Sequence, residues 1–467
     1  MEEILSSVNP LFFFKKTQKS FILKVPSNNR KELPCMSNDI RNLLNIKDPN
    51  IHFEENCVQR EEQAILIHCT LTYPLEECPH CQDKHSIVYN GTRSSRITYL
   101  DTAGQACYLI MKKQRYRCKT CHHCFTAQTQ LVPRNGFISL PTKQFIASLS
   151  TDTASEKSIA QKCRVSSHTV RRVIDDYAAT IRQHPTTLPE SLCFDEFKST
   201  TSCNGAMSFI FCDAITHQVI DVIEDRRLGS LKAYFYRFSR KERKKVKAII
   251  IDFYLPYMFL IRELFPNAVI IIDPFHIVQS LNRELNRYRV SFMNSIRYKD
   301  SKLYNKLKRY WRLILMDPDR LVHINYLRFP LFNHPTNTGS IIDYLLGQDD
   351  LLKETYETVH QLVSAIRDRD FDRFKETIDQ SKIKTLPKGL KRVIRSFNKY
   401  LEAISNTCHH PQLSNGPIEG INNKIKVLKR NAYGYRNYSH FRHRILLIAR
   451  LYVSGRNKEG TKQGLAA

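Results

Sequence analysis

Three acidic residues stand where a site for divalent metal could be assembled. Asp195 lies in the strand-like segment 192–197, Asp252 directly follows the apolar run 246–251, and Glu419 comes much later in the chain. Clustered carboxylates repel and raise one another's pKa, so their natural use is to hold cations, and oxygen ligands suit Mg²⁺ or Mn²⁺. One ion could activate a water or 3′-hydroxyl while a second steadies the leaving oxygen. The three acids therefore predict two-metal cleavage of phosphodiester bonds.

The segment that carries Glu419 has the pattern of an amphipathic helix with a basic face. Asn415 or Gly416 can cap this helix, and Pro417 suits its first position. One apolar stripe consists of Ile418, Ile421, Ile425 and Leu428. Phosphate-binding groups follow the acid at helical spacing on the neighbouring face, namely Asn423, Lys426 and Arg430. A solvated amphipathic helix is the alternative, but it does not explain a lone acid among so many bases.

Two residues compete for the role of the second acid. Asp252 and Asp273 both end apolar runs, and Asp273 is followed by Pro274, Phe275 and His276. We favour Asp252, because it closes the fourth strand of the predicted sheet. Asp273 and His276 then support the site from beside it, with His276 as a hydrogen-bonding neighbour of a ligand.

The elements that must position these acids follow from the hydrophobic period. Period-two segments predict three consecutive strands, at 192–197, 207–213 and 219–224. A basic helical stretch, a buried strand, a second helix and a last strand follow, at 231–245, 246–252, from 257, and at 268–273. This order predicts an α/β fold with a mixed sheet, matching a ribonuclease H-like core in which the first and fourth strands lie side by side.

Residues 281–410 read as an all-helical insertion between the second and third acids. They are charged and free of strand signals, as in 354–369 and 371–378. Trp311, the one tryptophan, is expected to be a core residue of its helix, with stacking on an unpaired base as the alternative.

Two Cys-x-x-Cys knuckles precede the catalytic segments. Their four thiolates can hold one structural Zn²⁺ as a zinc ribbon, with Cys78, Cys81, Cys118 and Cys121 as ligands. The loop between the knuckles is long, so Cys124 or a neighbouring histidine is a substitute ligand, and chance clustering of free thiols is the alternative.

Residues 142–177 have helical periodicity and contain a helix-turn-helix pattern. Ile159, Ala160, Val165, Val170 and Ile174 can pack its two helices, and Ser166 can cap the second. The groups left facing outward for a DNA groove are Ser167, His168, Thr169, Arg171 and Arg172. A helical hairpin with a basic solvent face is the alternative. Residues 184–189 are then predicted to form a linker.

Composition indicates a nucleic-acid partner. The chain has 467 residues, 72 Lys and Arg against 45 Asp and Glu, and a formal charge of +27, with the basic residues spread along its length. No secretory signal opens the chain, and no apolar segment is long enough to span a bilayer, so we expect no membrane and a cytoplasmic protein, associated with the nucleoid when bound to DNA. Fourteen cysteines in that reducing setting favour metal ligation over disulfides.

The chain resembles the ISL3 family of bacterial insertion-sequence DDE transposases from about Met36 to near the C-terminus. The likeness rests on the paired knuckles, the helix-turn-helix, Asp195-Glu196-Phe197, the 273–276 segment and the specific string at 415–435. The resemblance implies a nuclease and strand transferase that binds the terminal inverted repeats of its element and target DNA. It also implies a homo-oligomer with paired ends. A non-catalytic DNA-binding regulator derived from a transposase, or a ribonuclease H-like nuclease, are the alternatives.

These interpretations divide the chain into six parts. We hypothesise that Met36 is the native start and that 1–35 is an upstream extension. The remaining parts are a zinc-ribbon domain at 36–135, a helix-turn-helix domain at 140–183, the catalytic core at 190–280 and 411–455, the helical insertion at 281–410 and a C-terminal tail at 456–467.

Overall fold

The computed structural model describes residues 36–180, 185–203 and 205–450. The hypothesis on residues 1–35 and the predicted tail at 456–467 lie outside these residues. The chain forms two compact units, one made of the described residues up to 97 together with 108–135, and the other made of 98–107 and the residues from 136 onward. No helix among the described residues is long and apolar enough to cross a membrane.

The first unit is built on a six-stranded sheet in the order β1-β3-β5-β4, with β2 paired to β3 and β6 paired to β5. Its elements are α1 (Met36–Leu43), β1 (Ile51–His52), β2 (Val58–Arg60), β3 (Ala64–Leu71), β4 (Ile87–Thr98), β5 (Ala106–Cys118) and β6 (Cys124–Thr126). Residues along β3 are mostly buried in alternation, as expected for a strand with one face on a core. The two long strands β4 and β5 separate the knuckles, which explains the long spacing between them.

Three helices of the second unit precede its central sheet: α2 (Leu140–Leu149), α3 (Glu156–Lys162) and α4 (Ser167–Thr180). Ile159, Val170 and Ile174 are fully buried in their shared core, while Val165 packs against its edge. Ser155 caps α3, and Ser166 accepts a hydrogen bond from the backbone N–H of Thr169 at 3.2 Å. The predicted helix-turn-helix is therefore present, with its second helix preceded by the predicted cap.

The centre of the second unit is a five-stranded mixed sheet in the order β11-β10-β7-β8-β9. Its strands are β7 (Ser191–Lys198), β8 (Met207–Asp213), β9 (Val219–Ile223), β10 (Ala248–Ile251) and β11 (Val269–Ile272). β7, β8 and β9 are antiparallel neighbours, whereas β10 runs parallel to both β7 and β11. This is the predicted ribonuclease H-like arrangement, with the first and fourth strands of this sheet side by side.

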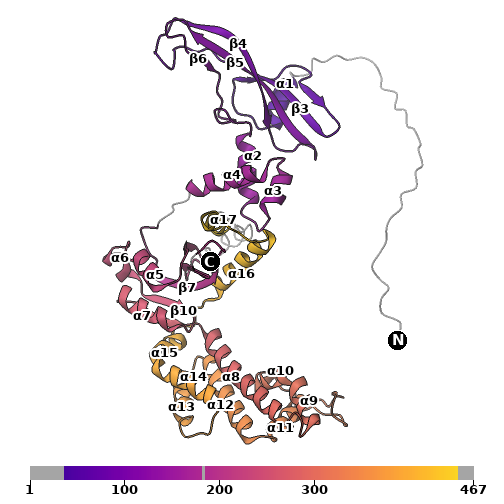
Figure 1. Ribbon diagram of the computed structural model, residues 1–467, viewed down its shortest axis with the longest axis vertical. Helices are drawn as coiled ribbons and strands as arrows, with labels where there is room; N and C mark the ends of the chain where they lie inside the picture. The colour runs from indigo at the N-terminus through magenta and orange to yellow at the C-terminus, as the bar shows by residue number, and fades with distance from the viewer. Residues whose placement is uncertain (1–35, 181–184, 204, 451–467) are drawn as a thin grey trace, which may run out of the picture. The chain divides into compact units, whose positions relative to one another are not determined.

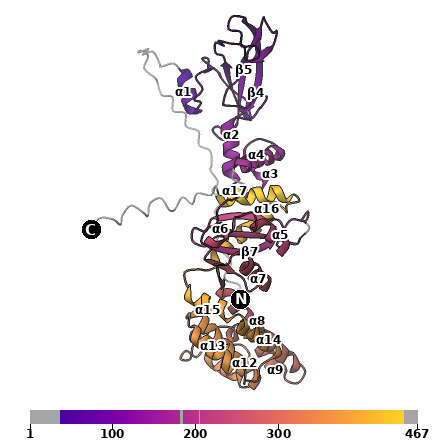
Figure 2. The same ribbon diagram turned by 90° about the vertical axis from the view of Figure 1, so that its left-hand side faces the viewer.

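Helices cover both faces of this sheet. On one face lie α16 (Gly416–Asn431) and α17 (Tyr438–Arg450), whose apolar side chains pack on Cys193 and Phe197. On the other lie α5 (Leu228–Phe235) and α7 (Leu255–Leu264), packed on Leu192 and Phe194. Figure 2 shows α16 and α17 together on the same side of the strands. The predicted single helix at 231–245 was wrong, because the chain turns at 236–239 and continues as α6 (Arg240–Lys245).

The segment between β11 and α16 is helical, as predicted. It contains α8 (Pro274–Ser295), α9 (Ser301–Arg309), α10 (Trp311–Ile314), a 3₁₀ turn (Pro318–Arg320), α11 (Thr338–Leu346), α12 (Asp350–Arg367), α13 (Phe371–Gln380), α14 (Lys388–Lys399) and α15 (Leu401–His409). Figure 1 shows these helices gathered against one another, coloured from red to orange. Trp311 is 37% exposed, so the expectation that it is a core residue was wrong. The predicted domain boundaries stay predictions.

Candidate active site

The parallel strands bring three aspartates to one edge of the sheet. Ile250 pairs with Cys193 between β10 and β7, and Ile251 pairs with Ile272 between β10 and β11. Because parallel strands keep their register, the residues that follow come side by side at the carboxyl ends of β10 and β11. Asp252 therefore stands next to Asp273, and Asp195 occupies the corresponding place on β7. A row of carboxyl groups thus forms, from Asp252 and Asp273 at the ends of β10 and β11 and from Asp195 beside them within β7.

Asp195 faces the helix that carries the third predicted acid. Side chains alternate along a strand, so Asp195 shares its side with Cys193 and Phe197, which pack beneath α16. The Asn422 amide donates to Asp195 Oδ2 at 2.6 Å, and the backbone N–H of Glu196 donates to Oδ1 at 2.7 Å. Burial and the charge of Asp252 raise the pKa of Asp195 to about 6 despite these two donors.

Asp252 is held between two donors from different elements. His276, in the first turn of α8, places Nε2 2.8 Å from Asp252 Oδ1. Asn415 directly precedes α16 and donates from Nδ2 to the same oxygen at 3.2 Å. The hydrogen bond to Asp252 raises the pKa of His276. Asn415 makes no side-chain cap for its own helix, because its amide is turned to the acid.

Asp273 is the most buried of the three aspartates, at 8% exposed. It precedes α8, and one of its carboxylate oxygens lies within 4.8 Å of a carboxylate oxygen of Asp252 and of a ring nitrogen of His276. Burial raises the pKa of Asp273, and the charges of Asp252 and Glu419 add to that rise. The structure thus leaves both candidates for the second acid at the site.

Glu419 lies in the first turn of α16 and is exposed. Its charge acts on Asp273, but it does not belong to the close group of Asp252, Asp273 and His276. Asn423, Lys426 and Arg430 follow on exposed positions of the same helix, and Lys426 Nζ lies 3.4 Å from Asn423 Oδ1. The predicted apolar stripe is largely correct, because Ile418, Ile425 and Leu428 are buried and Ile421 packs at the edge.

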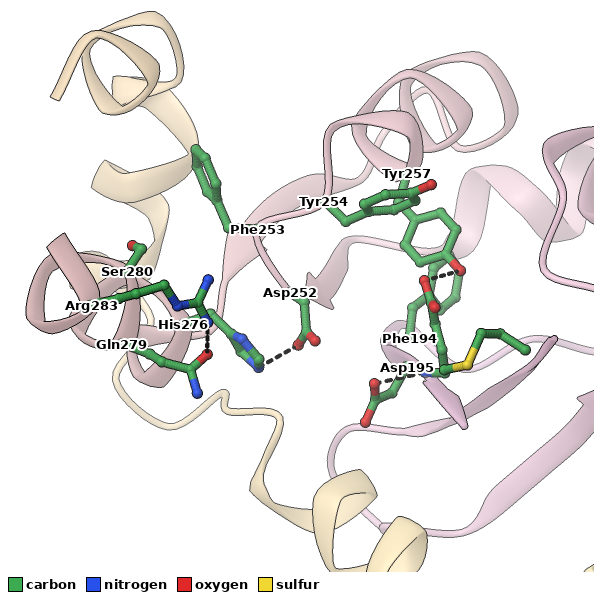
Figure 3. Close-up of a pocket in the computed structure, with 12 residues that line it drawn as sticks. Phe194, Asp195, Asp252, Phe253, Tyr254, Tyr257, His276, Gln279, Ser280 and Arg283 are labelled. Carbon is green, nitrogen blue, oxygen red and sulfur yellow. Dashed lines mark hydrogen bonds and ion pairs between the residues drawn. The ribbon is translucent and has the colours of Figure 1, made fainter. Parts of the chain in front are cut away.

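A cavity of about 480 Å³ opens between Asp195 and Asp252. Figure 3 shows Asp252 between His276 and Asp195, with His276 reaching Asp252 from α8. Gln279 and Arg283, one and two turns further along α8, also line the cavity. Their donors suit phosphate oxygens.

The residue after Asp195 faces the opposite side of the sheet. Glu196 accepts a hydrogen bond from the Tyr257 hydroxyl at 2.9 Å and forms an ion pair with Arg226. These contacts hold β7 at Glu196 on the face of the sheet opposite to α16. The segment that carries Asp195 is therefore held from both faces of the sheet.

Sequence reasoning missed the roles of four side chains around the acids. These are Asn415, Asn422, Glu196 and Tyr257. Asn422 carries a signal that could have been used, since it follows Ile418 by four residues and a polar side chain on a buried stripe requires a partner. Tyr257 carries no such signal, because its contact depends on how α7 packs.

The four predicted zinc ligands come together in the first unit. Sγ of Cys78 lies 3.7 Å from Sγ of Cys121, and Sγ of Cys81 lies 3.6 Å from Sγ of Cys118. A zinc tetrahedron with Zn–S bonds of about 2.3 Å has edges of about 3.8 Å. Backbone N–H groups of Cys121 and Thr120 lower the pKa of Cys118 to about 7. The four thiols therefore fit Zn²⁺, and the group does not include Cys124.

The predicted DNA-reading residues lie at the start of α4. Ser167, His168, Arg171 and Arg172 are exposed, while Thr169 is half-buried. Arg171 forms an ion pair with Glu156 at 3.2 Å, so part of its charge is engaged within the helical domain.

Comparison with known protein families identifies the family that has this combination of domains. A model described as a transposase of the ISL3 group matches residues 192–445, more than half of the 467 residues. The chain belongs to the ISL3 family of transposases. A second model, the zinc-finger of transposases IS204, IS1001, IS1096 and IS1165, matches residues 74–121, and the helix-turn-helix domain of family ISL3 matches 127–178. The ISL3 chain thus carries a zinc ribbon, a DNA-binding helix-turn-helix and a DDE transposase domain in that order.

Two curated proteins are similar to this ISL3 transposase chain. The transposase for insertion sequence element IS1001 of Bordetella parapertussis is 30% identical over 264 residues, which cover 56% of this chain and 62% of that protein. A protein of Lactococcus lactis subsp. lactis named ATP-dependent protease is 39% identical over 114 residues, covering 24% of this chain and 36% of that protein. The chain therefore spans less than two thirds of the length of either relative.

Proposed function

We propose that this chain binds the terminal inverted repeats of an insertion sequence and catalyses metal-dependent cleavage of the element's ends and their transfer to target DNA. The observation that carries the proposal is the row of aspartates formed by Asp195 within β7 and by Asp252 and Asp273 at the ends of β10 and β11, beside a helix that bears Glu419 and a basic face. The name of the IS1001 relative and the family match support the same activity.

Asp195, Asp252 and Glu419 are proposed as the residues that hold divalent cations, with Mg²⁺ as the physiological ion. The chemistry of the donors fits such ions, because burial and mutual repulsion raise the pKa of Asp195 and Asp273 and so create a demand for positive charge. Two buried amide oxygens, of Asn415 and Asn422, have no hydrogen-bond partner among the described residues. Bound cations would activate the attacking hydroxyl and offset the charge that builds at phosphorus.

Other side chains of the chain orient these acids. Asn422 holds Asp195 from α16, and His276 and Asn415 hold Asp252. Each of these contacts restricts the rotation of a carboxylate, which keeps its oxygens in place before DNA arrives. Arg283, in the cavity wall, supplies a donor for a phosphate oxygen.

Glu419 completes the proposed set from a different element, the first turn of α16. Its exposed carboxylate stands outside the close group around Asp252. We propose that binding of DNA and metal draws Glu419 inward, and that a homo-oligomer with paired ends is the active form.

The test is a reaction of purified protein with labelled element ends, target plasmid and Mg²⁺. Joined product supports the transposase. Nicking without joining favours a ribonuclease H-like nuclease, and binding without cleavage favours a regulator. Zinc content is measured on the same protein: we expect one equivalent for each chain, lost on Cys118→Ser, and a zinc-free folded chain would contradict the ribbon assignment.

A further inference from the structure

Two cavities lie on either side of the turn 431–437, which joins α16 to α17. The first, of about 620 Å³, is bounded by this turn and by the starts of α3 and α4, and we name it the reading-side cavity. The second, of about 700 Å³, lies between the end of β7, the start of β8 and the later turns of α16, and we name it the catalytic-side cavity. Gly434 and Tyr435 line both of them. The turn is therefore the shared wall between the DNA-reading helices and the helix of Glu419.

Both cavities have basic walls. The cations of the reading-side cavity are Lys157, Arg171 and Arg436, and those of the catalytic-side cavity are Lys198, Lys426, Lys429 and Arg430. Among the described residues that line the two cavities, Glu156 is the one acid, and it is paired with Arg171 and His440. A surface with this surplus of positive charge is complementary to a polyanion.

Tyr433 projects from the wall between the cavities. It is fully exposed and has a φ of +54°, and Gly434 follows at +98°. A bulky residue at positive φ costs roughly 1 kcal/mol or more and persists where the surrounding structure holds it. Backbone N–H groups of Tyr433 and Gly434 donate to carbonyls in the last turn of α16, and the next residue, Tyr435, is buried and stacks on Phe441 with ring centroids 4.7 Å apart. The turn is thus anchored at one aromatic ring and presents the other to solvent.

The two cavities keep fixed positions relative to one another because the helix-turn-helix domain, α2 to α4, is hydrogen-bonded to α17. Arg444 is fully buried and donates to the backbone carbonyls of Ser150, Asp152 and Ala154. At the start of the turn, Asn431 donates to the carbonyl of Thr153 at 3.0 Å. These bonds tie the loop before α3 to Asn431, at the start of the 431–437 turn, and to α17, which follows the turn, so the reading helices and the turn are held next to one another.

We propose that DNA bound by the helix-turn-helix crosses the 431–437 turn on its way to the acids, with the cations of both cavities on its phosphates and Tyr433 stacked on one of its bases. The proposal rests on the proposed function and deepens it by naming the path of the DNA. Aromatic rings stack on exposed bases irrespective of sequence. Tyr433 therefore positions the end of the element, whereas α4 selects it.

The experiment uses the full chain and a duplex that carries the inverted repeat bracketing the reading frame, with 2-aminopurine at successive positions between the repeat and the cleaved bond. We expect the wild type to change the fluorescence at one of these positions, and Tyr433→Ala to abolish that change and to lower the cleavage rate roughly tenfold or more. Tyr433→Phe, which keeps the ring, should behave as wild type. Tyr298→Ala is the matched control, because Tyr298 is also a largely exposed tyrosine, at 92%, in the turn between α8 and α9.

The cations are tested separately, by affinity at increasing salt. Arg436→Ala should weaken binding to any duplex and reduce the slope of log affinity against log salt by about one. If Tyr433→Ala matches Tyr298→Ala in fluorescence and cleavage, the path is wrong.

Binding and cleavage also separate this proposal from the proposed activity. If the wild type binds the repeat without cutting it, the activity fails, while the fluorescence of the Tyr433 variants still decides the path. A wild-type chain that binds no duplex overturns both proposals.

Discussion

Two clusters of acids and histidine in the same unit have opposite electrostatic character. Near the helix-turn-helix, His440 Nε2 lies 2.5 Å from Glu156 Oε1, and its Nδ1 lies 2.9 Å from Asp175 Oδ1. Burial would raise the pKa of both acids, but their histidine partners outweigh it and hold both pKa values below the ordinary range. At the edge of the sheet, the pKa values of Asp195 and Asp273 are raised instead. Similar residue types thus give one satisfied cluster and one that is short of positive charge.

The difference comes from which groups supply positive charge to the carboxylates. His440 uses both ring nitrogens on carboxylates, while Arg171 and His443 add further contacts to Glu156 and Asp175. In the sheet cluster, His276 contacts Asp252, and Asp195 is held by the neutral Asn422 amide and a backbone N–H. The first cluster can therefore fasten helices without any ion. In the second, the carboxylates repel one another, and a cation would relieve that repulsion, which supports the proposal that this cluster is the catalytic site.

The largest effect that tests this contrast is on cleavage. Asp195→Asn and Asp252→Asn should each lower the rate of end cleavage by roughly a thousandfold or more, because each removes a charge from the proposed cation site. Gel assays in Mg²⁺ measure the rate, and unchanged binding to the terminal repeat serves as the control for folding. Asp273→Asn should retain more activity than Asp252→Asn, and the reverse order would give Asp273 the role of the second acid.

The row of aspartates itself could be predicted from the sequence. The apolar runs before Asp252 and Asp273 are long enough to predict buried parallel strands, and strand order then places their carboxyl ends together. The paired knuckles likewise predict a zinc site at short range, and the structure brings the four sulfurs together as expected.

What escaped prediction depends on packing between distant segments. Asn422 meets Asp195 across 227 positions of sequence, and Tyr257 meets Glu196 because α7 crosses beneath β7. The exposed position of Trp311 is of the same kind, since a hydrophobic period identifies a helix but not which of its faces a neighbour covers.

A smaller effect is expected from the neutral donor that holds Asp195. Asn422→Ala removes the 2.6 Å hydrogen bond to Asp195 Oδ2 and should slow cleavage by roughly 10- to 100-fold. The concentration of Mg²⁺ needed for half-maximal rate should rise as well, which a purely structural role would not produce. Val427→Ala, on an exposed position of the same helix and outside the proposed phosphate-binding set, is the matched control. Equal effects of the two substitutions would contradict the role of Asn422.

The satisfied cluster predicts a pH-dependent stability. Burial lowers the pKa of His440, but hydrogen bonds to Glu156 and Asp175 outweigh it and raise the pKa above the ordinary value of 6.5. The stabilisation is therefore fully present below the pKa of the unfolded state and is lost as pH rises through the folded pKa. Urea unfolding between pH 5 and 9 should show this loss in the wild type and a flatter profile in His440→Gln. Glu156→Gln should lower the free energy of unfolding by about 1–3 kcal/mol near pH 6. If neither substitution changes the pH profile of stability, His440 does not have this role.

The smallest expected effect is on the free energy of unfolding, and it distinguishes the two clusters most directly. Since folding raises the pKa of Asp195 to about 6, its ionised form destabilises the folded protein at neutral pH. Asp195→Asn should therefore increase the free energy of unfolding without metal by on the order of 1 kcal/mol. Asp175→Asn, in the satisfied cluster, should decrease it. Added Mg²⁺ should stabilise the wild type but not Asp195→Asn, because a ligand stabilises a fold only through a site that binds it. If both substitutions decrease the free energy of unfolding, the acids at the sheet edge are as well neutralised as those beside His440. That result would contradict the inference that the sheet-edge acids need a bound metal ion.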